Sequence, residues 1–254
     1  MKRLCAALSF LTVIPLPAVC RHTEQDLTKS VAFFPLVGLL IGLSAAGICM
    51  SLKGVFPPLV IAVILVGWLV VVQGGLHPDG LADTADGFLS HHGRERVLSI
   101  MRDSHIGAFG SLAIMGILAL KVAALASLPH EYCIKAVLIT PLVGRCIMVF
   151  MLNFSPPART DGLRNLFYRD RTVWQSVKES IGTTIILLGG VWFTAEFVGL
   201  FAGVVVVVTM ILFVYWCKRR IGGITGDTLG AANEITEMLV LLVLCTQWAT
   251  TFHI

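Results

Sequence analysis

Long apolar runs separated by shorter polar segments dominate this chain. A helix needs roughly 20 residues to cross a hydrocarbon core about 30 Å thick. The runs predict membrane spans near residues 31–52, 57–74, 107–128, 136–153, 180–196, 198–216 and 236–252. The second and fifth are short, so one of them could be re-entrant. The pattern predicts an all-α fold, a polytopic membrane helix bundle of about six to eight transmembrane helices.

Composition supports this class, because 56% of the residues are hydrophobic, 13% are charged, and the mean hydropathy is +0.86. A soluble core of 254 residues could not bury that much apolar surface. No linker, low-complexity tract or clear repeat divides the chain, so residues 1–254 are predicted to form a single integral-membrane domain. Pro15 and Pro17 interrupt the first apolar segment, which predicts an interfacial helix rather than a signal peptide.

The seven cysteines show no CxxC pair or other metal-binding spacing. Small thiols without such spacing are typical of buried apolar positions. We therefore expect all of them to be small core residues in a reducing or lipid setting.

Basic residues are distributed unequally between the two ends of the predicted bundle. With the N-terminus inside, the outer side receives only Lys53 and Lys135, while Lys121 and Arg145 fall within spans and need partners. The inner side receives Lys2, Arg3, Arg21, Lys29, Arg94, Arg96, Arg102, Arg159, Arg164, Arg169, Arg171, Lys178, Lys218, Arg219 and Arg220. This asymmetry predicts a membrane protein whose chemistry faces the cytoplasm. The net charge of +4 reflects topology and does not indicate nucleic-acid binding.

An acidic row follows the second predicted span. Asp79, Asp83 and Asp86 have the spacing i, i+4 and i+7, which places them on one face of a helix. Carboxylates alone are the ligands of hard cations, so the row predicts a site for Mg²⁺, or Mn²⁺, shared with phosphates. His77 lies two residues before the row and is a candidate substrate contact. The alternative is a solvated loop whose acids balance nearby arginines.

Two further motifs carry polar groups at the predicted inner face. Arg102 could bind a phosphate, and Asp103 could be a fourth metal ligand or the general base, although both could merely anchor the third span. Asp227 and Glu234 lie seven residues apart on one helical face, a spacing that suits a second metal or the incoming ribose. The alternative is an acidic cap at the start of the last span.

Two arginines outside these motifs are candidate phosphate contacts, Arg159 in a polar loop and Arg145 within the fourth predicted span. An arginine at membrane depth can equally pair with an acid. Carboxylates and arginines at one membrane face, without a nucleotide-binding soluble domain, indicate metal-assisted attack on a phosphoanhydride. One acid would take the proton from the attacking hydroxyl.

Three segments, GGLHPDGLADTADGF, GRERVLSIMRDSHIGAFG and GGITGDTLGAANEITE, closely resemble the cobalamin synthase family, the adenosylcobinamide-GDP ribazoletransferases. The likeness covers nearly the whole chain. It implies transfer of adenosylcobinamide phosphate from adenosylcobinamide-GDP to alpha-ribazole or alpha-ribazole 5'-phosphate, with release of GMP. It also implies Mg²⁺ and a bacterial or archaeal cytoplasmic membrane. A homo-oligomer is compatible with the sequence.

A looser resemblance is to the CDP-alcohol phosphotransferases, whose D-x-x-D-G pattern fits the stretch from Asp83 to Gly87. The rest departs, because Gly107 stands where that family has its last aspartate. Asp103, Asp227 or Glu234 could then act as the base, and Asp86 and Asp103 are the predicted catalytic acids. The competing functions are a phosphotransferase acting on lipid head groups and an ion-coupled secondary transporter.

Overall fold

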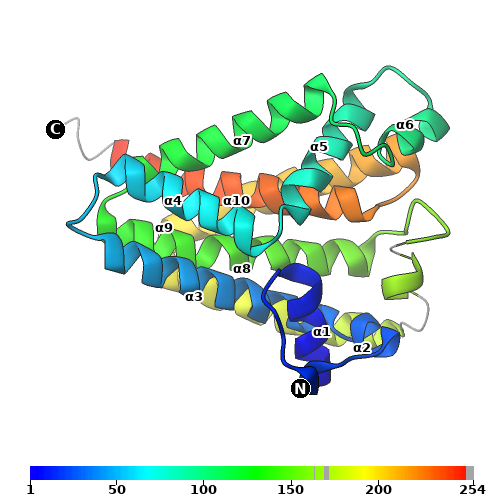
Figure 1. Cartoon of the computed structure of the whole chain (residues 1–254), viewed down its shortest axis with the longest axis horizontal. Helices are drawn as coiled ribbons and strands as arrows, with labels where there is room; N and C mark the ends of the chain where they lie inside the picture. Colours follow the sequence, from blue (N-terminus) through cyan, green and yellow to red (C-terminus); the bar gives the residue numbers. More distant parts are fainter. Residues whose placement is uncertain (163, 169–171, 250–254) are drawn as a thin grey trace.

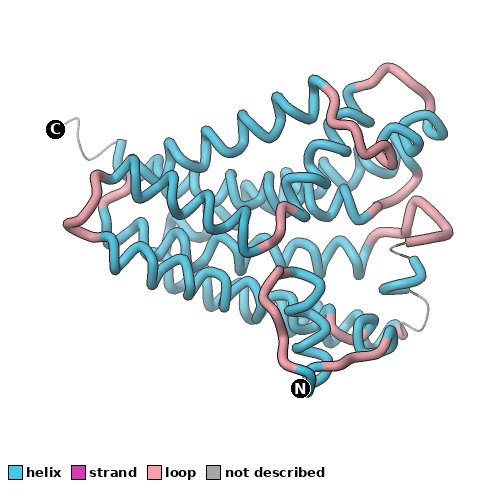
Figure 2. Tube along the Cα trace, in the orientation of Figure 1, coloured by secondary structure: helices cyan, strands magenta, loops and turns pink. Residues whose placement is uncertain are grey.

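The computed structural model describes residues 1–162, 164–168 and 172–249, which form helices and connecting loops without a strand. The predicted all-α fold is therefore confirmed. Long helices lie side by side in a bundle, and shorter ones gather around one of its ends (Figures 1 and 2). The long helices are α3 (Phe34–Leu52), α4 (Pro58–Val72), α7 (Ala108–Ser127), α8 (His130–Phe154), α9 (Val173–Ile221) and α10 (Gly226–Ala249). The shorter ones are α1 (Lys2–Leu11), α2 (Glu24–Thr28), α5 (Leu76–Leu89) and α6 (Arg94–Ile100).

Among the described residues, five helical stretches are long and apolar enough to cross a membrane, and α4 with α5 makes a sixth if that bent pair is one span. The multi-pass prediction is therefore confirmed, at the lower end of the expected range. The five stretches are Val31–Leu52, Ala108–Ser127, His130–Phe154, Gly199–Ile221 and Gly226–Thr246.

The short second span predicted at 57–74 is explained by a sharp bend. Helix α4 has 15 residues and spans about 22 Å, less than a hydrocarbon core. Gly74 and Gly75 follow it with φ angles of 62° and 72°, a left-handed conformation that glycine adopts without steric cost. Helix α5 then departs at 87° from α4. The acidic row therefore lies on a separate helix.

Helix α9 contains both the fifth and sixth predicted spans. It folds back on itself, because Thr184 and Leu188 line the same cavity as Val204 and Val208. The second half, Gly199–Ile221, has the length and hydropathy of a span. The separate span predicted at 180–196 stays a prediction, because the side chains of residues 191–196 lie outside the described part of the chain.

The last helix begins earlier than expected. The prediction started it at residue 236, but α10 begins at Gly226. Residues 250–252 of the predicted span lie outside the described part of the chain. Glu234 and Glu237 consequently lie inside a helix and are buried, rather than at its start. Their charge lowers the local hydropathy, which is why the predicted boundary fell too late.

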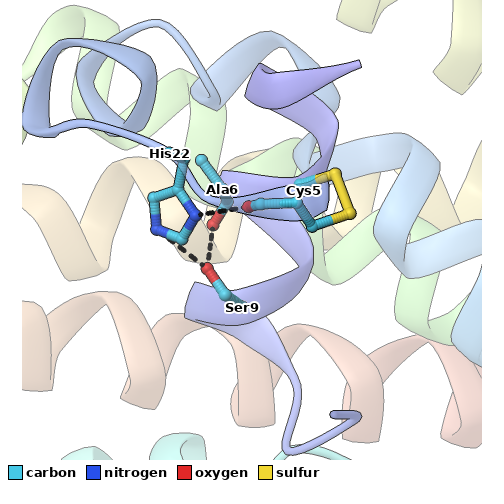
Figure 3. Close-up of a disulfide and its surroundings, with 5 residues drawn as sticks. Cys5, Ala6, Ser9 and His22 are labelled. Atoms are coloured by element: carbon cyan, nitrogen blue, oxygen red, sulfur yellow. Dashed lines mark hydrogen bonds between the residues drawn. A yellow bond between two sulfur atoms is a disulfide. The ribbon is translucent and has the colours of Figure 1, made fainter. Parts of the chain in front are cut away.

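The cysteine prediction is wrong for one pair. Cys5 in α1 and Cys20 in the short 3₁₀ helix Ala18–Cys20 form a disulfide, close to where His22 approaches Ser9 (Figure 3). Pro15 and Pro17 turn the chain back so that Cys20 meets the buried face of α1, a return that residue spacing does not reveal. The prediction is confirmed for the buried free thiols of Cys49, Cys133, Cys146 and Cys217.

The polar connections lie at one end of the bundle. The loops that follow α5, α6, α8 and α9 are all at that end, whereas the α3–α4 and α7–α8 turns are at the other (Figure 1). Helix α1 lies beside the polar end and buries Ala6, Ala7 and Leu11 while exposing Lys2 and Arg3. Such an amphipathic helix suits the predicted interfacial position.

Candidate active site

Helices α5 and α10 approach each other closely through two glycines. A Cβ atom added at Gly80 would lie 2.7 Å from the backbone oxygen of Asp227, and one at Gly230 would lie 3.1 Å from the backbone of His77. Neither position can carry a side chain without moving a backbone. The acidic row and the C-terminal motif therefore lie against each other.

Three carboxylates gather along this contact. Asp79 is exposed, while Asp83 and Asp227 are partly buried. Asp83 is near enough to both of the others for electrostatic repulsion, and the guanidinium of Arg159 partly offsets it. Asp227 accepts a hydrogen bond of 3.2 Å from the Thr225 hydroxyl. Like charges this close favour binding of a cation between them.

Asp86 has a structural partner in α7. Its carboxylate accepts hydrogen bonds from the backbone nitrogens of Gly107, at 2.7 Å, and Gly110, at 2.9 Å. An acid at a helix N-terminus satisfies free N–H groups and meets the positive end of the helix dipole. A Cβ atom at either glycine would overlap this carboxylate. Asp86 thus joins α5 to α7, and its predicted metal-binding and catalytic roles stay predictions.

The second motif lies on the surface. Arg102 donates to Asp161 at 2.6 Å, and both side chains are more than half exposed. Asp103 accepts hydrogen bonds from the His105 backbone nitrogen, at 3.1 Å, and from its ring at 2.6 Å. These bonds lower the pKa of Asp103 below its usual range. No contact between Asp103 and the acids of α5 is found in the described part of the chain.

Arg159 lies at the junction of the motifs. Its Nη2 atom is 4.0 Å from Asp227 Oδ2 and donates to the Leu98 carbonyl at 3.0 Å. It lines a cavity of about 210 Å³ with Asp161 and Asp227, and another of about 320 Å³ with Arg102. Burial lowers the pKa of Arg159, an effect that Asp227 opposes. Its Nε atom is buried and has no hydrogen-bond partner within the protein.

Two other arginines, which the sequence analysis assigned only to topology, hold the polar end together. Arg94 donates to the carbonyls of Ile221, at 2.8 Å, and Ala158, at 3.1 Å. Arg220 donates to the carbonyl of Ser90 at 2.6 Å. The segment carrying Arg159 is further joined to the segment before α10, because the Ala158 N–H donates to the Ile224 carbonyl at 2.8 Å and the Ile224 N–H donates to the Pro156 carbonyl at 2.9 Å.

A buried ion network lies deeper in the bundle. Lys121 of α7 donates to Glu234 and Glu237 of α10, each at 2.7 Å. Arg145 of α8 pairs with Glu237 at 2.6 Å, and its Nη2 atom is 3.4 Å from the His77 ring. All five residues are buried. Arg145 therefore pairs with an acid, which is one of the two roles that the sequence left open; the other was a phosphate contact.

The same network separates Glu234 from the rim of the site. Glu234 is 2% exposed and paired to Lys121, whereas Asp227 remains accessible. The structure therefore brings Asp79, Asp83, Asp227 and Arg159 together. It does not bring Glu234, Arg145 or His77 to the surface beside them.

The donor chemistry of the accessible acids fits a hard cation. In the part of the chain that the structure describes, no three His, Cys, Asp or Glu side chains converge closely enough to hold a metal ion alone. Mg²⁺ commonly takes one or two carboxylates and completes its shell with waters and substrate phosphates. Asp83 with Asp79 or Asp227 meets that requirement.

Comparison with known proteins places the chain in a family. A model of the cobalamin-5-phosphate synthases matches residues 3–245. A protein of Syntrophobacter fumaroxidans is 40% identical over 92% of this chain and 94% of its own length. One of Desulfitobacterium hafniense is 36% identical over 95% and 96%. Both are named adenosylcobinamide-GDP ribazoletransferase, and no solved structure matches. The chain belongs to the cobalamin-5-phosphate synthase family.

Proposed function

We propose that this protein transfers adenosylcobinamide phosphate from adenosylcobinamide-GDP to alpha-ribazole or alpha-ribazole 5'-phosphate, releasing GMP. Membership of the family and the names of its relatives support the reaction. The structural observation that carries the proposal is the close α5–α10 contact, which gathers Asp83, Asp227 and Arg159 at one accessible place. Binding of a diphosphate needs both a cation and a positive side chain. The acids at this place could hold the cation, and Arg159 is the positive side chain.

The residues divide the work of a direct displacement. Asp83, together with Asp79 or Asp227, would hold Mg²⁺, which when bound neutralises the diphosphate and makes GMP a better leaving group. Arg159 lines the cavities beside these acids, and its guanidinium would bind a phosphate oxygen. A ribazole hydroxyl attacks the phosphorus that carries the adenosylcobinamide group. A new P–O bond forms, the bond to the GMP oxygen breaks, and an acid accepts the hydroxyl proton.

Asp103 remains our candidate for that acid. It is exposed and its carboxylate can accept a proton, although the hydrogen bonds from His105 lower its pKa and so weaken it as a base. Asp86 is engaged with two backbone N–H groups and would act chiefly by holding α7 against the site.

The function is tested with purified membranes given adenosylcobinamide-GDP, alpha-ribazole and Mg²⁺. We expect GMP and a cobalamin to appear, with both lost when a chelator removes the metal. The same membranes are offered a CDP-lipid with an alcohol acceptor. CMP release from that mixture, without GMP from the first, would favour a phosphotransferase acting on lipid head groups. No product with either form of ribazole would refute the proposal.

We also propose that the polar end faces the cytoplasm of the cell inner membrane. The basic asymmetry supports this orientation. A cysteine at His91, on the polar end, should resist an impermeant thiol reagent outside intact cells, whereas one at Val55, on the opposite end, should react. A Cys245→Ser background suffices, since the other free thiols are buried. The reverse labelling pattern would invert the topology.

A further inference from the structure

A second polar cavity lies away from the acidic motifs, between the N-terminal segments and the first half of α9. Its volume is about 440 Å³. It shares no lining residue with the cavities around Arg159. The proposed reaction therefore assigns it no role.

Positive charge converges on this cavity from three separate segments. Arg3 comes from α1, Lys29 follows α2, and Lys178 lies on α9. The acid in the lining is Glu179, which is 7% exposed and accepts a hydrogen bond of 3.1 Å from Gln175. The lining thus keeps an excess of positive charge. A topology signal explains basic residues at this end, but it does not require them to line one cavity.

Part of the remaining lining is apolar and leaves room. Phe33 and Ile186 contribute hydrophobic surface, and a Cβ atom added at Gly182 would meet nothing within 4 Å. The cavity therefore combines cationic groups with an apolar wall. An anionic phospholipid has the complementary groups, a negative head-group phosphate and apolar acyl chains.

The cavity is placed where a phospholipid could reach it. Trp174 lines it and is also 75% exposed, a position typical of aromatic residues at the membrane interface. Ile181 and Ile185, on the same half of α9, are 56% and 64% exposed, as expected for a surface that faces lipid.

We propose that this cavity, the α9 pocket, binds an anionic phospholipid of the surrounding membrane. Arg3, Lys29 and Lys178 would contact the head-group phosphate, and the acyl chain would lie along Ile186 and Gly182. A soluble phosphate compound would offer the same anion but no chain for the apolar wall. The bound lipid would join α1 to α9 and thereby stabilise the fold.

The test measures thermal unfolding of the full chain in phosphatidylcholine nanodiscs as phosphatidylglycerol is added. We expect stabilisation that saturates with phosphatidylglycerol content. The double variant Lys29→Gln/Lys178→Gln should bind the lipid on the order of tenfold to 30-fold more weakly, because each lysine contributes part of the attraction. The matched control is Lys218→Gln/Arg219→Gln, which removes two exposed positive charges at the same end outside the pocket.

A second variant guards against misfolding. Gly182→Leu keeps every charge and adds an apolar side chain at a position where a Cβ atom meets nothing within 4 Å, so it should also weaken the response to phosphatidylglycerol. An equal response in the double variant and the control would overturn the proposal in favour of general charge attraction. Equal stabilisation by inorganic phosphate or glycerol 3-phosphate, with nothing added by the lipid, would also overturn it. Ribazole transfer is assayed separately, so either proposal can fail without the other.

Discussion

Asp83→Asn is expected to abolish turnover while the protein still inserts and folds. An amide keeps the shape of the carboxylate but loses the charge that holds a divalent cation. Asp83 lies between Asp79 and Asp227, so its loss affects the centre of the group. Metal-assisted charge neutralisation contributes several kcal/mol, which corresponds to a loss of roughly a thousandfold or more in rate. GMP release under saturating substrate measures it.

The matched control for this prediction is Asp26→Asn. Asp26 is an acid of the polar end whose contacts are with Thr23 in a capping box of α2. Its amide variant should keep normal turnover. Near-native activity of Asp83→Asn at limiting Mg²⁺ would exclude Asp83 as a metal ligand and would restore the alternative of a solvated acidic segment.

Residue periodicity and charge predicted the parts of this fold that depend on local pattern. The long apolar runs gave the bundle, and the i, i+4, i+7 spacing correctly put Asp79, Asp83 and Asp86 on one helix. The bend between α4 and α5 depends on the left-handed backbone of Gly74 and Gly75, a conformation that the sequence permits without requiring.

Contacts between segments far apart in the sequence could not be predicted from the local pattern of residues. Asp86 and Gly107 are 21 residues apart, and only packing of α5 against α7 brings them together. A possible signal was Gly107 itself, because a helix that begins at a glycine has no side chain of its own to cap it. Likewise, no sequence feature near Cys5 indicates that Cys20 is its disulfide partner.

The seven-residue spacing of Asp227 and Glu234 suggested that both acids lie at the site, but only Asp227 is accessible, for a geometric reason. Seven residues return to the same face of a helix, but they also advance about 10 Å along its axis. One end of that face therefore meets the accessible acids, while the other lies within the bundle beside Lys121. Lys121 was recognised as needing a partner, yet the sequence could not say which acid would supply it.

The ion network itself should be a main determinant of stability. Lys121 and Arg145 provide two positive charges, and Glu234 and Glu237 two negative ones, all buried. Lys121→Met leaves two carboxylates facing one guanidinium. Removing one partner of a buried pair costs about 3–5 kcal/mol, because the remaining charge loses its compensation. We expect a loss of this size in denaturant unfolding of the protein in mixed micelles.

Restoring the charge balance should restore most of that stability. In Lys121→Met/Glu234→Gln, Arg145 and Glu237 remain as a neutral pair, so the double variant should be clearly more stable than Lys121→Met alone. The control Lys135→Met removes a lysine outside the network. A loss in Lys121→Met no larger than in this control would contradict the network's role. Turnover of the refolded double variant also decides on Glu234: normal activity would remove it from the substrate site, whereas a stable but inactive protein would show that its carboxylate serves the reaction.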